Sequence, residues 1–252
     1  MTAGIYLGTQ SWTNKNWRGN FYPKSTPPEN YLAEYAKRFH AVEIDSSFYA
    51  IPRPEVVTHW RDVTPDDFRF TAKFPRVITH QKILKDVAAE TRQFLDVMAL
   101  LKDKLGPLVL QFPFNFPIQH RERLAEYLTA LPREFRYVVE VRHPDWFAES
   151  FFNLLRAYRV ALVLADYGKF PSSIQITTDF TYVRWVGNRK DFPDNQVHAL
   201  IDRATELDQW SRVMTRLAAQ GVTVWGFAND VYQGHAPTTV HALAERIGAV
   251  AN

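Results

Sequence analysis

Residues 68–112 read FRFTAKFPRVITHQKILKDVAAETRQFLDVMALLKDKLGPLVLQF and contain the pattern that decides the fold. The segments 68–73 and 108–112 are short and apolar, which is typical of buried strands. Between them, apolar residues recur at the spacing of one helix face: Phe94, Met98, Leu101 and Leu105. The stretch therefore predicts a strand–helix–strand unit, the building block of a parallel sheet.

The same pattern recurs along the chain. Six more strand-like segments lie at 5–9, 41–45, 137–142, 160–165, 181–186 and 222–227, and most are followed by an amphipathic helical pattern. Eight strands alternating with helices predict a single (β/α)8 TIM barrel that spans residues 1–252. An open doubly wound sheet is less favoured, because no glycine-rich dinucleotide turn follows the first strand. The stretch 167–179 is too short and too polar for a full crossover helix, so the sixth helix should be reduced or missing.

The composition narrows the function classes. The chain has 252 residues, 46% of them hydrophobic, a net charge of +3 and no cysteine. Disulfides, thiolate nucleophiles and cysteine-based metal sites are thereby excluded. No basic, apolar leader opens the sequence and no apolar run is long enough to span a bilayer, so we expect a cytoplasmic protein with no membrane partner. Neither a Walker loop nor a GxSxG elbow is present.

Charged side chains gather at the carboxyl ends of the predicted strands, where TIM barrels carry their active sites. If the neighbouring valines and isoleucines face the helices, period-2 alternation turns Glu43, Asp45, Glu140 and Arg142 into the barrel. Lys73 and Arg184 follow the same alternation, and Gln111 and Asp166 close the fourth and sixth strands. Buried charges need partners, so the set predicts either a structural ion-pair layer or a site completed by a ligand.

As an active site, the set divides into proton-transfer and binding groups. Glu140 and Glu43 are candidates for a general acid and base, while Lys73, Arg142 and Arg184 would bind an anionic group. His80 is the best proton-transfer candidate among the eight histidines, although it could equally be structural. Asp166 could be a base, a metal ligand or a turn former. No cofactor is implied; a divalent metal is an alternative, with His143 and His235 as further ligands.

Aromatic residues also crowd the predicted strand ends. Those of interest here are Trp12, Tyr49 and Trp146, which could stack on a base or a sugar face or merely fill space between loops. Asn229 and His235 follow the eighth strand and complete the predicted binding residues.

Ordered phrases along nearly the whole chain resemble the domain-of-unknown-function 72, or YecE-like, family. They are WTNKNWRGNFYP, VEIDSSFYAIP, FRFTAKFPRVITH, LVLQFPFNF, VVEVRHPDW, LADY, TYVRWVGNR and FANDVYQGHAP. The resemblance implies a TIM barrel and a bacterial or archaeal cytosolic protein, but no established activity, substrate or cofactor. The barrel is also similar in outline to the endonuclease IV-like superfamily, which is an analogy of fold alone.

The family's patterned residues fall on the same predicted mouth. Among them are Trp12, Glu43, Tyr49, Lys73, His80, Gln111, Glu140, Arg142, Trp146, Asp166, Arg184, Asn229 and His235. Two departures stand out: Trp185-Val186-Gly187 replaces an expected His-Gly step, and Ala228-Asn229 replaces a pair of asparagines. A histidine-dependent role after the seventh strand is therefore not expected.

Three functions are consistent with these residues. The leading prediction is a hydrolase-like enzyme that acts on a small anionic or nucleotide-like substrate in the mouth of the barrel. A non-catalytic module that binds nucleic acid would use surface lysines and arginines with exposed aromatics. A glycosidase-like enzyme would need a suitably spaced carboxylate pair. The oligomeric state is not predicted.

Overall fold

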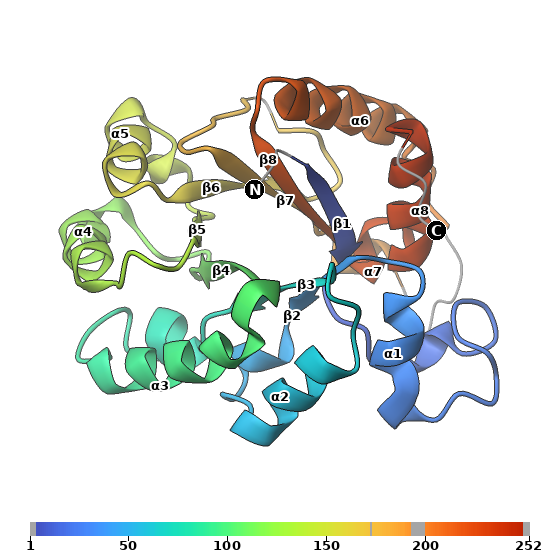
Figure 1. Ribbon diagram of the computed structural model, residues 1–252. Helices are drawn as coiled ribbons and strands as arrows, with labels where there is room; N and C mark the ends of the chain where they lie inside the picture. The colour runs from blue at the N-terminus through green and yellow to red at the C-terminus, as the bar shows by residue number, and fades with distance from the viewer. Residues whose placement is uncertain (1–3, 172, 193–199, 249–252) are drawn as a thin grey trace.

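The computed structural model describes residues 4–171, 173–192 and 200–248. Its centre is a closed barrel of eight parallel strands in chain order, and β8 pairs with β1 to complete the ring (Figure 1). The strands are β1 Ile5–Thr9, β2 Ala41–Ile44, β3 Arg69–Lys73, β4 Leu105–Gln111, β5 Tyr137–Glu140, β6 Ala161–Asp166, β7 Phe180–Trp185 and β8 Thr223–Ala228. The predicted TIM barrel is thus confirmed.

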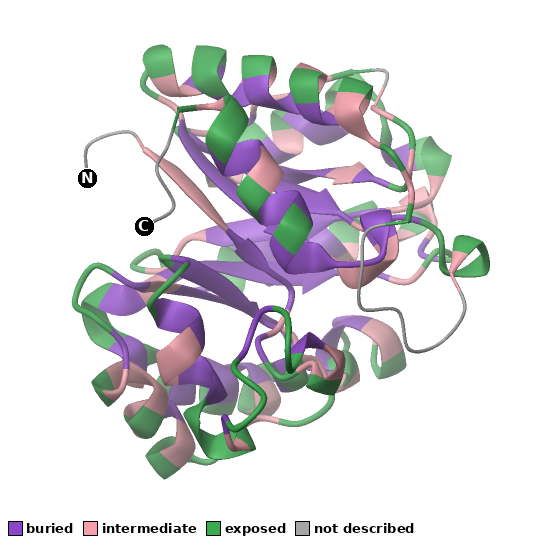
Figure 2. Cartoon of the chain, turned by 90° about the vertical axis from the view of Figure 1, so that its right-hand side faces the viewer, coloured by how far each residue is buried: buried purple, intermediate pink, exposed green. Residues whose placement is uncertain are grey.

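Helices surround this ring on its outer side, as Figure 1 shows. They are α1 Tyr31–Ala36, α2 Pro54–Asp62, α3 Ala88–Met98, α4 Arg121–Ala130, α5 Glu149–Tyr158, α6 Ala204–Ala219, α7 Asp230–Gln233 and α8 Ala236–Arg246. Each of the longer helices buries one apolar face against the strands and exposes the other, a contrast visible in Figure 2. This amphipathic pattern is what period-3.6 spacing of apolar residues produces.

Two apolar cores hold the barrel together. The larger fills the space between strands and helices and includes Val42, Ile44 and Val139. The smaller lies inside the barrel, where the Tyr6 and Trp225 rings stack with centroids 4.3 Å apart. Because Val42 and Val139 face outward, Glu43 and Glu140 face inward, as the alternation predicts.

A glycine permits closure at the β1–β2 seam. A Cβ atom at Gly8 would overlap the carbonyl oxygen of Ala41, its register partner on β2. The hydroxyl of Tyr35 also enters this seam and donates to the same Ala41 oxygen at 3.0 Å. Only a residue without a side chain lets these two strands and the tyrosine come so close.

The sixth connection lacks its helix, as predicted. Residues 167–171 and 173–179, the described part of the link between β6 and β7, form no helix. Apolar side chains of this loop, Phe170, Ile174 and Ile176, pack against the outer core in its place. Thr177 fixes the loop, since its hydroxyl donates to Val160 O at 2.7 Å and accepts from Leu162 N at 3.1 Å.

One helix is shorter than the sequence pattern indicated. The helical spacing extended to Leu105, but α3 ends at Met98 and is followed by tight 3-10 turns over Ala99–Lys104. Lys102 takes a positive φ of 53°, and Leu105 already begins β4. The Gly106-Pro107 pair that follows disfavours a helix and favours extended backbone. The helical spacing of the apolar residues therefore reflects which side chains are buried, not a continuous helix.

Candidate functional site

A cavity of about 750 Å³ opens at the carboxyl ends of the strands. We call it the mouth cavity. Seven of the residues predicted from the sequence line it: Tyr49, Lys73, His80, Gln111, Arg142, Arg184 and Asn229. They lie at or after the ends of six strands, β2 to β5, β7 and β8, so the parallel strands bring them together at one rim.

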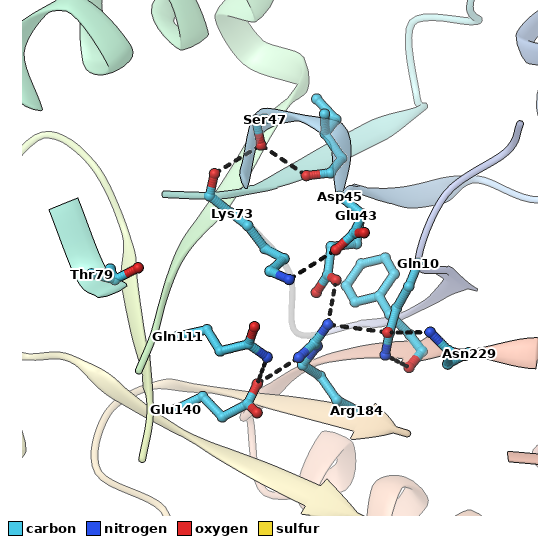
Figure 3. Close-up of polar contacts among 12 residues, drawn as sticks. Gln10, Glu43, Asp45, Ser47, Lys73, Thr79, Gln111, Glu140, Arg184 and Asn229 are labelled. Carbon is cyan, nitrogen blue, oxygen red and sulfur yellow. Dashed lines mark hydrogen bonds and ion pairs between the residues drawn. The ribbon is translucent and has the colours of Figure 1, made fainter. Parts of the chain in front are cut away.

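A buried ion bridge forms the floor beneath this cavity. The guanidinium of Arg184 on β7 lies between two carboxylates, donating from Nη2 to Glu43 Oε1 at 2.8 Å and from Nη1 to Glu140 Oε2 at 2.6 Å (Figure 3). Glu43 is 0% exposed and Glu140 1% exposed, so neither carboxylate is among the groups that line the cavity. We call this the Glu43–Arg184–Glu140 bridge.

Glu140 is held by three further donors. Gln111 Nε2 lies at 2.9 Å, Arg142 Nε at 2.8 Å and the Tyr167 hydroxyl at 3.0 Å. Burial alone would raise the pKa of Glu140, but Arg184 and Arg142 outweigh it and hold that pKa well below its usual range. The carboxylate is therefore ionised and saturated with hydrogen bonds, an arrangement that orients cations rather than one that exchanges protons.

Glu43 completes the bridge on the other side of Arg184. The buried Tyr182 hydroxyl donates to Glu43 Oε2 at 2.7 Å and contacts the Thr71 hydroxyl at 2.8 Å. Gln10 Oε1 accepts from Arg184 Nη2 at 3.0 Å and from Asn229 Nδ2 at 3.1 Å. These contacts link the polar floor to the barrel interior and fix the guanidinium in one orientation.

Lys73 stands at the edge of the floor. Its Nζ donates to Asp45 Oδ1 at 2.9 Å and lies 4.4 Å from the centroid of the Phe48 ring. Ser47 braces this corner, because its hydroxyl contacts Ile44 O at 2.9 Å and Lys73 O at 2.8 Å (Figure 3). Lys73 retains donor capacity beyond the Asp45 contact, since an ammonium carries three N–H groups.

His80 lies on a π-helical turn, Val77–Gln81, that follows β3. Its Nδ1 is 2.9 Å from the Thr79 hydroxyl, and its ring meets the Phe48 ring edge-on at 4.9 Å. Burial, followed by the nearby Arg142, Lys73 and Arg76 charges, lowers the pKa of His80 to about 4. The imidazole is therefore neutral near pH 7. Single π turns of this kind often occur at functional sites.

Exposed aromatic rings form part of the rim. Tyr49 follows β2, Phe114 follows β4 and Tyr167 follows β6, and all three line the mouth cavity. The Arg142 guanidinium lies 4.6 Å from the Phe114 centroid and 5.9 Å from that of Tyr167. Burial and the adjacent Glu140 raise the pKa of Tyr167, which keeps its hydroxyl protonated as a donor.

Besides Glu43 and Glu140, four predicted site residues lie outside the lining of the cavity. Asp166 is fully buried and accepts from Trp210 Nε1 at 2.8 Å, the Tyr232 hydroxyl at 3.0 Å and Gly168 N at 2.8 Å. Trp12, Trp146 and His235 are also buried, and the Trp146 indole donates to Phe116 O at 2.7 Å. Asp166 thus acts as the turn former that the sequence left open, tying the β6–β7 loop to α6.

The lining includes residues that the sequence did not single out as site residues. Among them are Gln10, Asp45, Phe48, Arg76, Phe114, Tyr167 and Arg189. Asp45 was expected to point inward, but the other six follow strand ends in loops whose paths no periodicity encodes.

Within residues 4–171, 173–192 and 200–248, no cluster of three or more acidic or histidine side chains is placed to hold a metal ion. In the same ranges no helix is long and apolar enough to cross a membrane.

The chain is similar in sequence and structure to known proteins. The family described as "Protein of unknown function DUF72" matches residues 6–252. The chain belongs to the DUF72 family. The DUF72 chain is 30% identical over 260 residues to UPF0759 protein YunF of Bacillus subtilis, covering 92% of this chain and 90% of that protein.

Other relatives agree with this assignment. UPF0759 protein YecE of Escherichia coli K12 is 40% identical over 146 residues, or 58% of this DUF72 chain, and the chain spans about half the length of that relative (51%). A solved DUF72 family structure from Thermotoga maritima superposes with a TM-score of 0.79 at 26% identity, covering 97% of this chain and 99% of that one. These similarities establish the family and the fold, and the descriptions of these relatives name no activity.

Proposed function

We propose that this DUF72 chain is a hydrolase-like enzyme that acts on a small anionic substrate bound in the mouth cavity. The observation that carries the proposal is an excess of positive charge with free donors. Five cationic side chains line the cavity: Lys73, Arg76, Arg142, Arg184 and Arg189. Three carboxylates, Asp45 in the lining and Glu43 and Glu140 beneath it, oppose them. The cavity therefore carries two uncompensated positive charges, which favours anions such as phosphates.

Several donors remain available for such an anion. Among the described residues, the side chains of Arg76 and Arg189 make no hydrogen bond or ion pair. Arg142 uses its Nε on Glu140, which leaves both terminal nitrogens for a ligand. A guanidinium with two free nitrogens can bind a phosphate or carboxylate in bidentate fashion. Glu140 acts as the group that aims this fork.

We assign proton transfer to His80 rather than to Glu43 or Glu140. Both carboxylates are buried under the cavity and engaged by Arg184, whereas His80 is neutral and lines the cavity. In the tautomer that donates Nδ1–H to Thr79, Nε2 can accept a proton from a water that attacks the substrate, and it can return this proton to the leaving group as the scissile bond breaks. A bound anion would offset the surrounding cations and raise the pKa of His80 toward the operating pH.

The two alternative functions draw less support from the same contacts. A glycosidase needs two carboxyl groups that reach the sugar, and here both share one buried arginine. A nucleic-acid-binding module would use a continuous basic surface, whereas the donors on which this proposal rests, those of Arg76, Arg142 and Arg189, line one cavity.

The test is a thermal-shift screen with inorganic phosphate, sugar phosphates, neutral sugars and oligonucleotides. A ligand present at about one hundred times its Kd stabilises the native state by about 2.7 kcal/mol, a shift of several degrees. We expect phosphates to raise the Tm of the wild type and Arg76→Ala to weaken the effect. Arg212→Ala, an exposed arginine on α6, is the matched control.

Catalysis is tested on the compounds that bind. The His80→Asn variant should still bind these compounds but should no longer turn them over. Phosphorus or proton NMR measures the turnover. A response to neutral sugars alone, or to oligonucleotides alone, would contradict the proposal and favour one of the two alternatives.

A further inference from the structure

We infer that the substrate carries a flat aryl ring, such as a nucleobase, stacked at the rim by Tyr49 and Phe114 while its anionic group lies on the cationic floor. This inference rests on the proposed function and adds the class of compound. Two observations carry it: where the exposed aromatic rings lie, and which cavity groups remain uncommitted.

Exposed large apolar side chains concentrate at this cavity. Of the five among the described residues, Tyr49 (67% exposed), Phe114 (63%) and Tyr167 (37%) all line it, while Phe147 and Leu200 lie elsewhere. Scattered single exposures are ordinary, but a group around one opening marks a surface that something covers. The three follow β2, β4 and β6, alternate strands of the ring, so they lie along the β2–β6 side of the opening.

The hydrogen bonds that the other lining residues already make within the protein indicate which class of ligand the cavity can bind. Gln10 and Asn229 each use both amide atoms within the protein: Gln10 contacts Arg184, Asn229 and Phe227 O, and Asn229 also accepts from Val231 N. The Tyr167 hydroxyl donates to Glu140. A sugar needs partners for many hydroxyl groups. Of the four neutral amides in the lining, only Gln111 Oε1 and Asn188 Nδ2 have no hydrogen-bond partner among the described residues, which is few for a sugar.

The uncommitted groups on which this inference rests are of two kinds. Arg76, Arg189 and the terminal nitrogens of Arg142 offer positive charge. The Tyr49 ring, and the face of the Phe114 ring turned away from Arg142, offer apolar surface. A compound with an anionic end and a flat apolar end matches both kinds, because a π face needs no hydrogen-bond partner. Aryl phosphates and nucleoside monophosphates are the simplest such compounds.

The experiment compares Kd values by isothermal titration for phosphate, ribose 5-phosphate, phenyl phosphate and adenosine 5′-monophosphate. We expect the two aryl-bearing compounds to bind about tenfold more tightly than ribose 5-phosphate, the factor expected of one stacking contact. Phe114→Ala and Tyr49→Ala should remove this advantage and leave the Kd of phosphate within about twofold. Phe114→Tyr should retain it, and Phe147→Ala, an exposed phenylalanine outside the cavity, should have no effect.

The outcomes separate the two proposals. If phosphate binds but the aryl compounds show no advantage, or Phe114→Ala and Tyr49→Ala leave the advantage intact, the stacking inference is overturned and the anionic-substrate proposal stands. Equal affinity for ribose 5-phosphate and the nucleotide likewise overturns the stacking inference. If none of the four binds, the proposed function itself fails.

Discussion

Arg184 is the common partner of two buried carboxylates, and this makes it the most sensitive single residue of the floor. Arg184→Met would leave Glu43 and Glu140 buried with no shared cation. Removing one member of a buried ion network costs about 3–5 kcal/mol, so we expect a loss of that size in the free energy of unfolding, measured with urea.

A compensated variant provides the control for this prediction. Combining Arg184→Met with Glu43→Gln and Glu140→Gln removes the stranded charges, so it should recover a large part of the lost stability. A loss below about 1 kcal/mol in the single variant would mean that water reaches both carboxylates.

His80 makes stability depend on pH in a defined direction. Its pKa is about 4 in the folded protein against 6.5 for the free group, so between these values the unfolded chain binds more protons. Stability should therefore fall as pH decreases from about 6.5 toward 4, by about 1–2 kcal/mol after allowance for solvent screening.

Urea unfolding near pH 7 and near pH 5 measures this effect. His80→Asn should flatten the pH dependence, whereas His59→Asn, an exposed histidine on α2, should leave it unchanged. Equal slopes in the wild type and His80→Asn would show that His80 titrates normally in the folded protein.

At the level of single residues, alternation along strands was the reliable signal. It correctly turned Glu43, Glu140 and Arg184 inward, because neighbouring apolar residues must face the helices. It could not reveal that one guanidinium would bridge both carboxylates, since this depends on side chains from strands far apart in sequence. It also could not place Phe114 and Tyr167, whose positions follow from loop paths.

At the level of elements, α5 ends with a strained residue that offers a direct test. Arg159 caps the helix in the left-handed conformation, with φ 55° and ψ 42°, and its side chain is exposed with one long ion contact to Asp179 at 3.9 Å. Glycine adopts this conformation without the Cβ penalty. Arg159→Gly should therefore raise the free energy of unfolding by about 0.5–1 kcal/mol.

Arg159→Ala is the matched control, because it removes the same ion contact and keeps the Cβ atom. Differential scanning calorimetry of both variants separates the two contributions. A glycine variant no more stable than the alanine variant would show that the backbone at this cap carries no strain.

The helices and strands were predicted from the periodicity of apolar residues. Errors arose where the helical spacing continues into residues that form turns or a strand. The missing sixth helix was foreseen because polar residues interrupt 167–179. The end of α3 was not, because Leu101 and Leu105 continue the helical spacing although they lie in tight turns and in β4. Apolar spacing indicates which side chains are buried, and the backbone conformation that buries them depends on the Gly106-Pro107 pair.

At the level of the whole molecule, closure of the ring could be predicted from the number of strand–helix units. Its seam could not, because the close approach at Gly8 involves the β2 carbonyl of Ala41 and the α1 residue Tyr35. The charged layer at the strand ends was expected to be either a structural ion-pair layer or a ligand site. The Glu43–Arg184–Glu140 bridge is a structural ion-pair layer. It is also compatible with a ligand site, because it orients Arg142 and Arg184, which line the mouth cavity.

The Glu43–Arg184–Glu140 bridge also constrains the order in which the barrel folds. Glu43 comes from β2, Glu140 from β5 and Arg184 from β7, so the bridge forms late along any path that assembles the strands in sequence. An intermediate that collapsed before β7 arrived would bury Glu43 without a cation and Glu140 with Arg142 alone, at a cost of several kcal/mol. This cost disfavours premature collapse relative to an open chain whose carboxylates stay hydrated.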